Sequence, residues 1–174
     1  MLFRSLLGKH KYHLGVLNAA ASKGDWGKPL PAGVHRGIAQ FMGYGSYSAA
    51  TAEVSVNGND VKIHRMVLAT NCGHGVSLEQ IATQVQGGVA MGISTLMSES
   101  SVRDGKIYEI NFDRLAIPKI AHMPKVETVI QPTFDFWGGV GEPTICVVVP
   151  AVLNAIFAAT GKPDRKSTRL NSSH

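Results

Sequence analysis

Hydrophobic and polar positions along the chain predict two amphipathic helices in its first hundred residues. From Lys11 to Lys23 apolar residues recur at helical spacing, and Gly24 then ends the run, as a glycine after a helix commonly does. From Leu78 to Met97 apolar residues again stand three and four positions apart. Three glycines interrupt this second helix: Gly87, Gly88 and Gly92. Because each interior glycine costs about 0.5 to 1 kcal/mol relative to alanine, we expect another element to pack closely against it.

Between these helices the pattern predicts a β-hairpin. Residues 34–56 are rich in β-branched and aromatic residues, the turn signal NGND occupies 57–60, and VKIHRMVLAT follows at 61–70. Simple alternation assigns four residues of the second arm to one face: Val61, Ile63, Arg65 and Val67. The alternation of apolar and polar residues is imperfect, so we expect both faces of the sheet to be covered.

The last third of the chain predicts a turn with an irregular strand at 103–115, a short strand in VETVIQP at 126–132, and an apolar helix at 144–160 that Gly161 ends. Pro150 inside this helix implies a kink or a late start. Strands and helices do not alternate regularly, and no internal repeat is visible. The fold class is therefore α+β, with mixed strands, a hairpin and two long apolar helices.

Composition supports a globular domain. Of the 174 residues, 44% are hydrophobic and 17% are charged, which excludes a disordered chain. No apolar run approaches the roughly 18 residues that a membrane-spanning helix needs. The sequence therefore predicts one domain, or part of one, without a membrane span.

Both ends of the chain differ in character from the sequence between them. Asp164 to His174 reads DRKSTRLNSSH and resembles the in-frame translation of a sequencing adapter, and Met1 to Ser5 resembles the opposite adapter. We expect 1–5 and 164–174 to be adapter-derived and 6–163 to be the authentic segment. Excluding the two ends removes four basic residues and one acidic residue, so the formal net charge falls from +5 to +2. No cluster of basic and aromatic residues remains, and nucleic acid is not an expected partner.

The motif GGVGEP at 138–143 is the sharpest candidate for a functional site. The motif is typical of a flexible turn, which would place the Glu142 carboxylate at the start of a helix. An acidic residue there can simply cap the helix, because it accepts amide hydrogens and opposes the helix dipole. Gln84, on the glycine-containing helix, could reach a bound cofactor or could be solvated. A dinucleotide-binding motif is excluded because it needs glycine where the chain has Thr144.

The two cysteines do not predict a disulfide or a metal site. Cys72 stands in the turn-like sequence NCGHG, where we expect a loop, and Cys146 lies in ICVVV, where we expect a small buried side chain. Cys72 and His74 would supply two adjacent ligands with no second pair at zinc-site spacing. We therefore assign no metal ligand among the residues of this chain.

Several collinear segments together resemble a known family: WGKPLPAGVHRGIA, YGSYSAATAEVSVNG, ATQVQGGVAMGIS, GGVGEP and PAVLNAIFAATGK. Their order resembles the molybdopterin-binding large subunit of the xanthine dehydrogenase and aldehyde oxidase class of molybdenum hydroxylases, and the β subunit of isoquinoline 1-oxidoreductase is the most similar branch. The resemblance covers nearly all of 6–163. It implies that the chain is the incomplete C-terminal part of a larger molybdopterin-binding domain, whose N-terminal part lies upstream.

The resemblance also implies a chemistry. Glu142 would be the catalytic base that activates a molybdenum-bound hydroxide, and Gln84 and Gly141 would contact the molybdopterin cofactor, in its cytosine dinucleotide form. The substrate would be an N-heteroaromatic compound or an aldehyde, hydroxylated with oxygen from water. Electrons would leave through iron–sulfur clusters in a small [2Fe-2S] partner subunit. We expect the fragment to be inactive alone.

Two departures from the family pattern bear on this assignment. Asn71 stands where relatives usually have an acidic residue, and residues 74–80 lack the Asn-Pro-Asp turn that is common before the helix. The competing hypothesis is a noncatalytic structural or assembly module, in which Glu142 only caps a helix and the glycines only permit packing.

Overall fold

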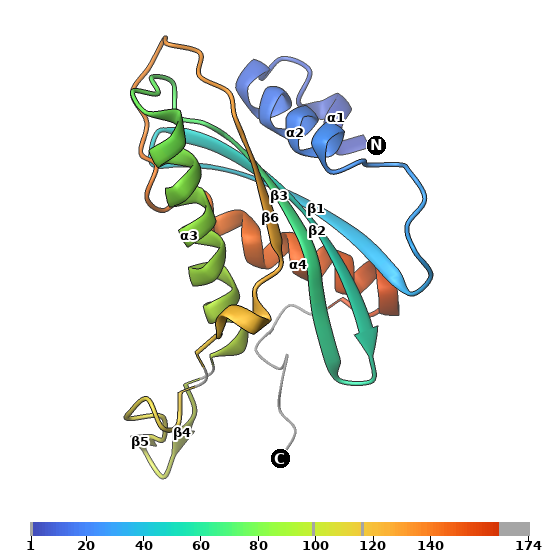
Figure 1. Cartoon of the computed structure of the whole chain (residues 1–174), viewed down its shortest axis with the longest axis vertical. Coiled ribbons are helices and arrows are strands. Elements are labelled where there is room, and N and C mark those ends of the chain that lie inside the picture. Colours follow the sequence, from blue (N-terminus) through green and yellow to red (C-terminus); the bar gives the residue numbers. More distant parts are fainter. Residues whose placement is uncertain (1, 99, 116, 164–174) are drawn as a thin grey trace.

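The structure is a computed structural model that describes residues 2–98, 100–115 and 117–163 (Figure 1). Its elements, in chain order, are α1 (Leu2–Leu6), α2 (Lys11–Lys23), β1 (Val34–Gly43), β2 (Ser46–Asn57), β3 (Asp60–Asn71), α3 (Leu78–Met97), β4 (Val102–Arg103), β5 (Lys106–Ile107), the short 3-10 helix η1 (Ile120–His122), β6 (Lys125–Ile130) and α4 (Ile145–Thr160). The α+β class is confirmed. The segment 164–174, which we expect to be adapter-derived, lies outside the described residues.

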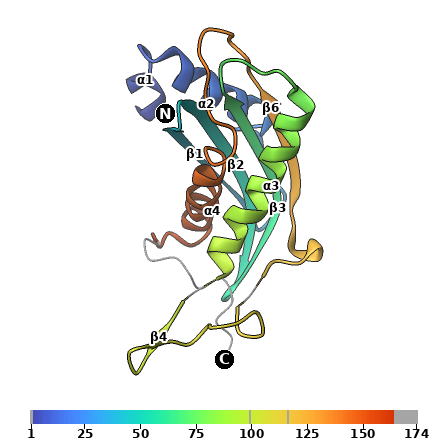
Figure 2. The same cartoon turned by 90° about the vertical axis from the view of Figure 1, so that its left-hand side faces the viewer.

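A four-stranded sheet in the order β1-β2-β3-β6 forms the centre of the fold. β2 pairs antiparallel with both β1 and β3, whereas β6 pairs parallel with β3. Helices α3 and α4 pack on one face of the sheet and α2 packs on the other (Figures 1 and 2). Both faces of β2 and β3 are therefore covered, as expected, and successive apolar residues on them enter two different cores.

Residues 34–56 form two strands, so the predicted single arm of a hairpin is wrong. The turn between β1 and β2 consists of Tyr44 and Gly45, whose φ angles are 56° and 72°. Two positive φ angles in a two-residue loop make a type I′ turn, which favours Asn or Gly at its first position. Because the first turn position is Tyr44, the sequence pattern does not indicate a turn here.

The face assignment of the second arm is also partly wrong, because β3 contains a bulge. Glu53 pairs with Arg65 but Val54 pairs with Ile63, which leaves His64 as one extra residue. An extra residue reverses the alternation that precedes it. Val61 and Ile63 therefore pack against the core under α3 and α4, whereas Arg65 lies on the α2 face.

Helix α3 has the predicted bounds, and its contact with α4 explains two of its three glycines. A Cβ added to Gly92 would lie 2.5 Å from the Val148 Cβ, and one added to Gly88 would lie 2.8 Å from the Thr144 Oγ1. A Cβ on Gly87 would meet nothing within 4 Å, so close packing does not explain this glycine.

Helix α4 starts at Ile145, well before Pro150, so a late start is excluded. Gly161 ends the helix in the left-handed conformation with φ 68°, as predicted.

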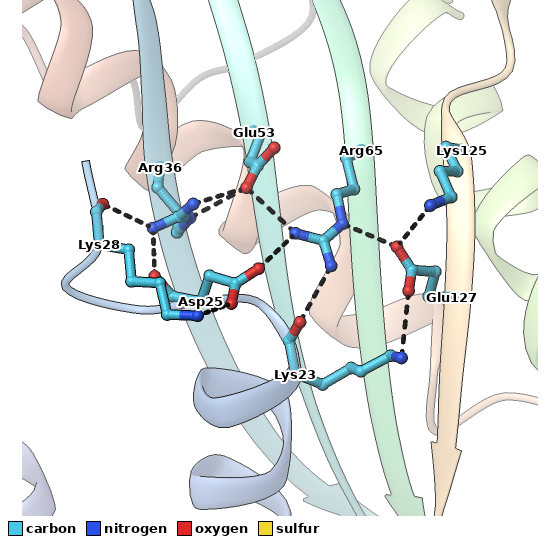
Figure 3. Close-up of polar contacts among 8 residues, drawn as sticks. All are labelled: Lys23, Asp25, Lys28, Arg36, Glu53, Arg65, Lys125 and Glu127. Atoms are coloured by element: carbon cyan, nitrogen blue, oxygen red, sulfur yellow. Dashed lines mark hydrogen bonds and ion pairs between the residues drawn. The ribbon is translucent and has the colours of Figure 1, made fainter. Parts of the chain in front are cut away.

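Charged residues form a row across the α2 face of the sheet (Figure 3). One comes from each strand: Arg36, Glu53, Arg65 and Glu127. Arg36 donates to Glu53 at 2.7 Å, and Arg65 donates to Glu127 at 2.8 Å. The end of α2 and the loop after it close the network, because Arg65 also contacts Asp25 and the Lys23 carbonyl. Ion pairs and hydrogen bonds thus join four strands to the end of α2, and the side chains of the four strand residues are between 8% and 21% exposed.

A small arm built on β4 and β5 projects away from the sheet (Figures 1 and 2). Its apolar side chains are exposed, among them Val102, Ile110 and Phe112. Across the described ranges, no helix combines the length and the apolar character needed to cross a bilayer.

Candidate functional site

Three connecting segments meet at one end of the sheet, at the top left of Figure 1. They are the β1–β2 turn at 44–45, the β3–α3 connection at 72–77, and the β6–α4 connection at 131–144. Backbone hydrogen bonds join them directly: the Gly138 amide donates to the Cys72 carbonyl at 2.9 Å, and the Gly139 amide donates to the Tyr44 carbonyl at 2.8 Å. The β6–α4 connection, which carries GGVGEP, is therefore held by both of the others.

The three site residues expected from the sequence lie together at this end. The Gln84 side chain, on the second turn of α3, donates from Nε2 to the Gly141 carbonyl at 3.3 Å, and Glu142 is the next residue. Gln84 and Gly141 are 57 positions apart in the sequence. The contact between α3 and α4 brings them close, because Gly88 on α3 packs against Thr144 and Ile145.

Glu142 is exposed, and its side chain has no hydrogen-bond or ion-pair partner among the residues that the structure describes. Only its backbone takes part in the start of α4, where the Ile145 amide donates to the Glu142 carbonyl at 3.0 Å. The N-cap residue of α4 is Thr144, which makes no side-chain cap hydrogen bond, and the first turn contains no acidic residue. The Glu142 carboxylate therefore makes no helix-capping contact in this structure and is accessible to a ligand.

The surface beside Gln84 and Gly141 has the open backbone that a bound cofactor needs. A Cβ on Gly87 or on Gly141 would meet nothing within 4 Å, so both glycines face open space. The Gln84 amide offers a donor and an acceptor, which suits the mixed hydrogen-bonding edge of a pterin. These features fit a cofactor placed between the start of α3 and the 138–144 segment.

The unusual residues before α3 have local structural roles. Asn71 is buried, and its Oδ1 accepts hydrogen bonds from the Gly73 amide at 2.9 Å and the Thr133 hydroxyl at 3.3 Å. A carboxylate could accept the same bonds, so the expected exchange of an acidic residue for asparagine at this position would preserve both contacts. His74 stacks on Trp137 with ring centroids 4.2 Å apart, and its Nδ1 lies 2.8 Å from the Phe136 carbonyl.

Cys72 lies in the β3–α3 connection, as predicted, whereas Cys146 is less buried than predicted. Cys72 is completely buried, and burial raises the pKa of its thiol, which opposes metal binding and reactivity. Cys146 is only half-buried, with its Sγ 3.7 Å from the Glu142 carbonyl. Across the described ranges, no three His, Cys, Asp or Glu side chains are grouped so as to hold a metal ion.

Two residues at the site have no functional signal in the sequence. Ser46 is completely buried and donates from its hydroxyl to the Gly139 carbonyl at 2.6 Å. Tyr44 is 61% exposed in a left-handed backbone conformation that tyrosine rarely adopts. A local strand pattern cannot show either role, because both depend on a segment more than ninety positions away.

The fold and this cluster are compatible with a domain that holds an organic cofactor. A family model described as molybdopterin cofactor-binding domain matches residues 17–124, and the chain belongs to that family. The matched range contains Gln84 and ends before Glu142.

Relatives of known name agree with the family. The chain is 33% identical over 124 residues to a protein of Bacillus subtilis that is named a probable xanthine dehydrogenase subunit, with 67% of this chain and 17% of that protein covered. It is 30% identical over 127 residues to the aldehyde oxidoreductase molybdenum-binding subunit PaoC of Escherichia coli K12, with the same coverage of 67% and 17%. The chain thus spans less than a fifth of the length of these relatives.

Solved structures give the same result. The crystal structure of the Cu,Mo-CO dehydrogenase in its carbon monoxide-reduced state matches with a TM-score of 0.60 and 25% identity, over 67% of this chain and 16% of that one. By their names these relatives are a xanthine dehydrogenase subunit, a molybdenum-binding aldehyde oxidoreductase subunit and a Cu,Mo-CO dehydrogenase, so the domain belongs to an oxidoreductase family.

Proposed function

We propose that residues 6–163 are the C-terminal part of the large subunit of a molybdenum hydroxylase, with Glu142 as its catalytic base. The observation that carries the proposal is the hydrogen bond from Gln84 to the Gly141 carbonyl, which joins the expected cofactor residue to the residue before the expected base. The exposed, unpaired carboxylate of Glu142 adds support, because a base must be free to accept a proton.

In this proposal the residues of the chain hold the cofactor and move one proton. The Gln84 amide and the backbone at Gly141 contact molybdopterin, in its cytosine dinucleotide form, and the open space at Gly87 accommodates it. When bound, the cofactor supplies the two-electron oxidation of the substrate. The Glu142 carboxylate accepts the proton of the water whose oxygen attacks an electron-poor carbon.

The proposed substrates are N-heteroaromatic compounds or aldehydes, and the β subunit of isoquinoline 1-oxidoreductase is the proposed nearest branch. Names of relatives support this substrate range, because they include a xanthine dehydrogenase and an aldehyde oxidoreductase. A small [2Fe-2S] subunit is the proposed electron-accepting partner. PaoC is named a molybdenum-binding subunit, which is consistent with other subunits that carry the remaining centres.

The test is Glu142→Gln in the complete subunit, expressed with its iron–sulfur partner. Loss of a general base lowers turnover by about 10²- to 10⁴-fold, whereas the molybdenum content and the melting temperature should not change. Glu79→Gln is the matched control, because Glu79 is an exposed glutamate in the first turn of α3. Full activity in Glu142→Gln would refute the role of the base and favour the noncatalytic module.

A further inference from the structure

We propose that Ser46 is a positioning residue that orders the segment carrying Glu142, an inference that rests on the proposed function of Glu142. The geometric basis is the Gly139 peptide. The Ser46 hydroxyl donates to the Gly139 carbonyl at 2.6 Å, and the Gly139 amide donates to the Tyr44 carbonyl at 2.8 Å. The β1–β2 turn therefore holds Gly139 through both its donor and its acceptor.

The contact between the turn and the loop is direct. A Cβ placed on Gly138 would lie 2.1 Å from the Ser46 Oγ and 2.5 Å from the Gly45 carbonyl oxygen, so only glycine fits at this position. The turn can present these groups because Tyr44 adopts φ 56° and Gly45 adopts φ 72°. A left-handed conformation is strained for tyrosine and persists only where the surrounding structure imposes it.

The hydrogen bond from Ser46 to Gly139 affects Glu142 because the backbone around Gly139 and up to Glu142 is rich in glycine. Gly138, Gly139 and Gly141 can populate many backbone conformations that other residues cannot. Two side chains restrict them: Ser46 holds Gly139 from the sheet, and Gln84 holds Gly141 from α3. Glu142 follows directly. Losing the anchor at Gly139 would let the carboxylate depart from its reactive position, and displacement of about 1 Å can lower turnover by about 100-fold.

The same strand provides a matched control. Ser48 is two residues from Ser46 on the same face of β2, and both side chains are completely buried. The Ser48 hydroxyl lies 3.2 Å from the Thr70 Oγ1 on β3, so its hydrogen bond stays within the sheet. Ser46→Ala and Ser48→Ala each remove one buried hydroxyl, but only Ser46→Ala removes a hydrogen bond to the loop.

The experiment compares Ser46→Ala, Ser48→Ala and Glu142→Gln in the complete, cofactor-loaded subunit with its partner. Ser46→Ala should lower kcat by about 10- to 100-fold with KM changed less than about threefold, while Ser48→Ala keeps kcat within about twofold. Hydrogen–deuterium exchange supplies a readout independent of activity. The amides of 138–142 should exchange at least about tenfold faster in Ser46→Ala than in Ser48→Ala.

Each outcome decides a separate point. Equal kcat values and equal exchange at 138–142 in the two serine variants would overturn the positioning role even if Glu142→Gln is inactive. Full activity of Glu142→Gln would overturn the proposed function, and with it this inference, whatever the exchange shows. If Ser46→Ala does not fold, Ser46→Cys, which replaces the hydroxyl by a slightly larger and weaker donor, should give a smaller loss of kcat in the same direction.

Discussion

Replacing Glu127 by glutamine should destabilise the protein at neutral pH and remove part of its sensitivity to acid. The Glu127 side chain is 19% exposed, and three cations surround its carboxylate (Figure 3). Arg65 lies at 2.8 Å, Lys125 at 3.2 Å and Lys23 at 3.4 Å. Hydrogen bonding from Arg65, followed by that from Lys125, lowers the pKa of Glu127 from 4.5 to about 2.

The direction of the pH dependence follows from this lowered pKa. The native state keeps Glu127 ionised at pH values where the unfolded chain binds a proton. The stabilisation is therefore complete above the unfolded-state pKa of 4.5 and is lost as the pH falls from there through about 2. A pKa shift of this size corresponds to about 3 kcal/mol. Solvent screening of a partly exposed group reduces the expected contribution to about 1 to 2 kcal/mol.

Equilibrium unfolding in urea, followed by circular dichroism at low micromolar protein, measures the effect. Urea is preferable to guanidinium, whose ionic strength would screen the network. At pH 7 Glu127→Gln should lower the free energy of unfolding by about 1 to 2 kcal/mol, and near pH 2 the two proteins should have almost equal stability.

Asp113→Asn is the control, because Asp113 is 68% exposed and lies 3.8 Å from its partner Arg114. Its free energy of unfolding should change by less than about 0.5 kcal/mol. If Glu127→Gln differed from the unmodified protein equally at both pH values, the lowered pKa could not be the source of the stabilisation.

Two further predictions concern backbone and packing. Gly92→Ala should lower the free energy of unfolding by about 1 to 3 kcal/mol, because the new methyl group would meet Val148. Gly87→Ala should raise it by about 0.5 to 1 kcal/mol, and changes of the same sign in urea unfolding would contradict the packing argument. Tyr44→Asn should raise the melting temperature, with a gain of about 1 kcal/mol, because Asn-Gly suits a type I′ turn. A lower melting temperature would show that the exposed tyrosine ring stabilises the fold.

Local signals explain which elements could be predicted from the sequence. The periodic helices at Lys11–Lys23 and Leu78–Met97 have the predicted bounds, because apolar spacing and a terminal residue define each one within its own segment. Ser77 caps the second helix by accepting from the Gln80 amide, which is also a local contact. These signals do not depend on the rest of the fold.

The sheet shows where such signals fail. The turn at Tyr44 lacks the Asn or Asp that marks type I′ turns, so the sequence pattern predicts one continuous arm where the structure has two strands. The bulge at His64 changes which residues face each core, although no local feature marks it as the extra residue. Tertiary contacts therefore override local preference at both places: the β6–α4 connection packs on the turn, and Arg65 enters the charged row only because the bulge directs it to that face.

The site depends even more strongly on contacts that sequence patterns do not report. Resemblance to a family predicts Glu142, Gln84 and Gly141 as site residues, but it does not reveal what holds them in place. Their arrangement depends on pairs 57 and 93 positions apart, formed between a helix, a turn and a glycine-rich loop. The glycines in that loop permit its close approach to Ser46. Because glycine adopts many backbone conformations, the same residues would let the loop become disordered if the contact with Ser46 were lost. If Ser46 orders the loop as proposed, the geometry of the Glu142 carboxylate depends on a serine and a strained turn in the first third of the chain, and substitutions there should disturb Glu142 before they disturb the fold.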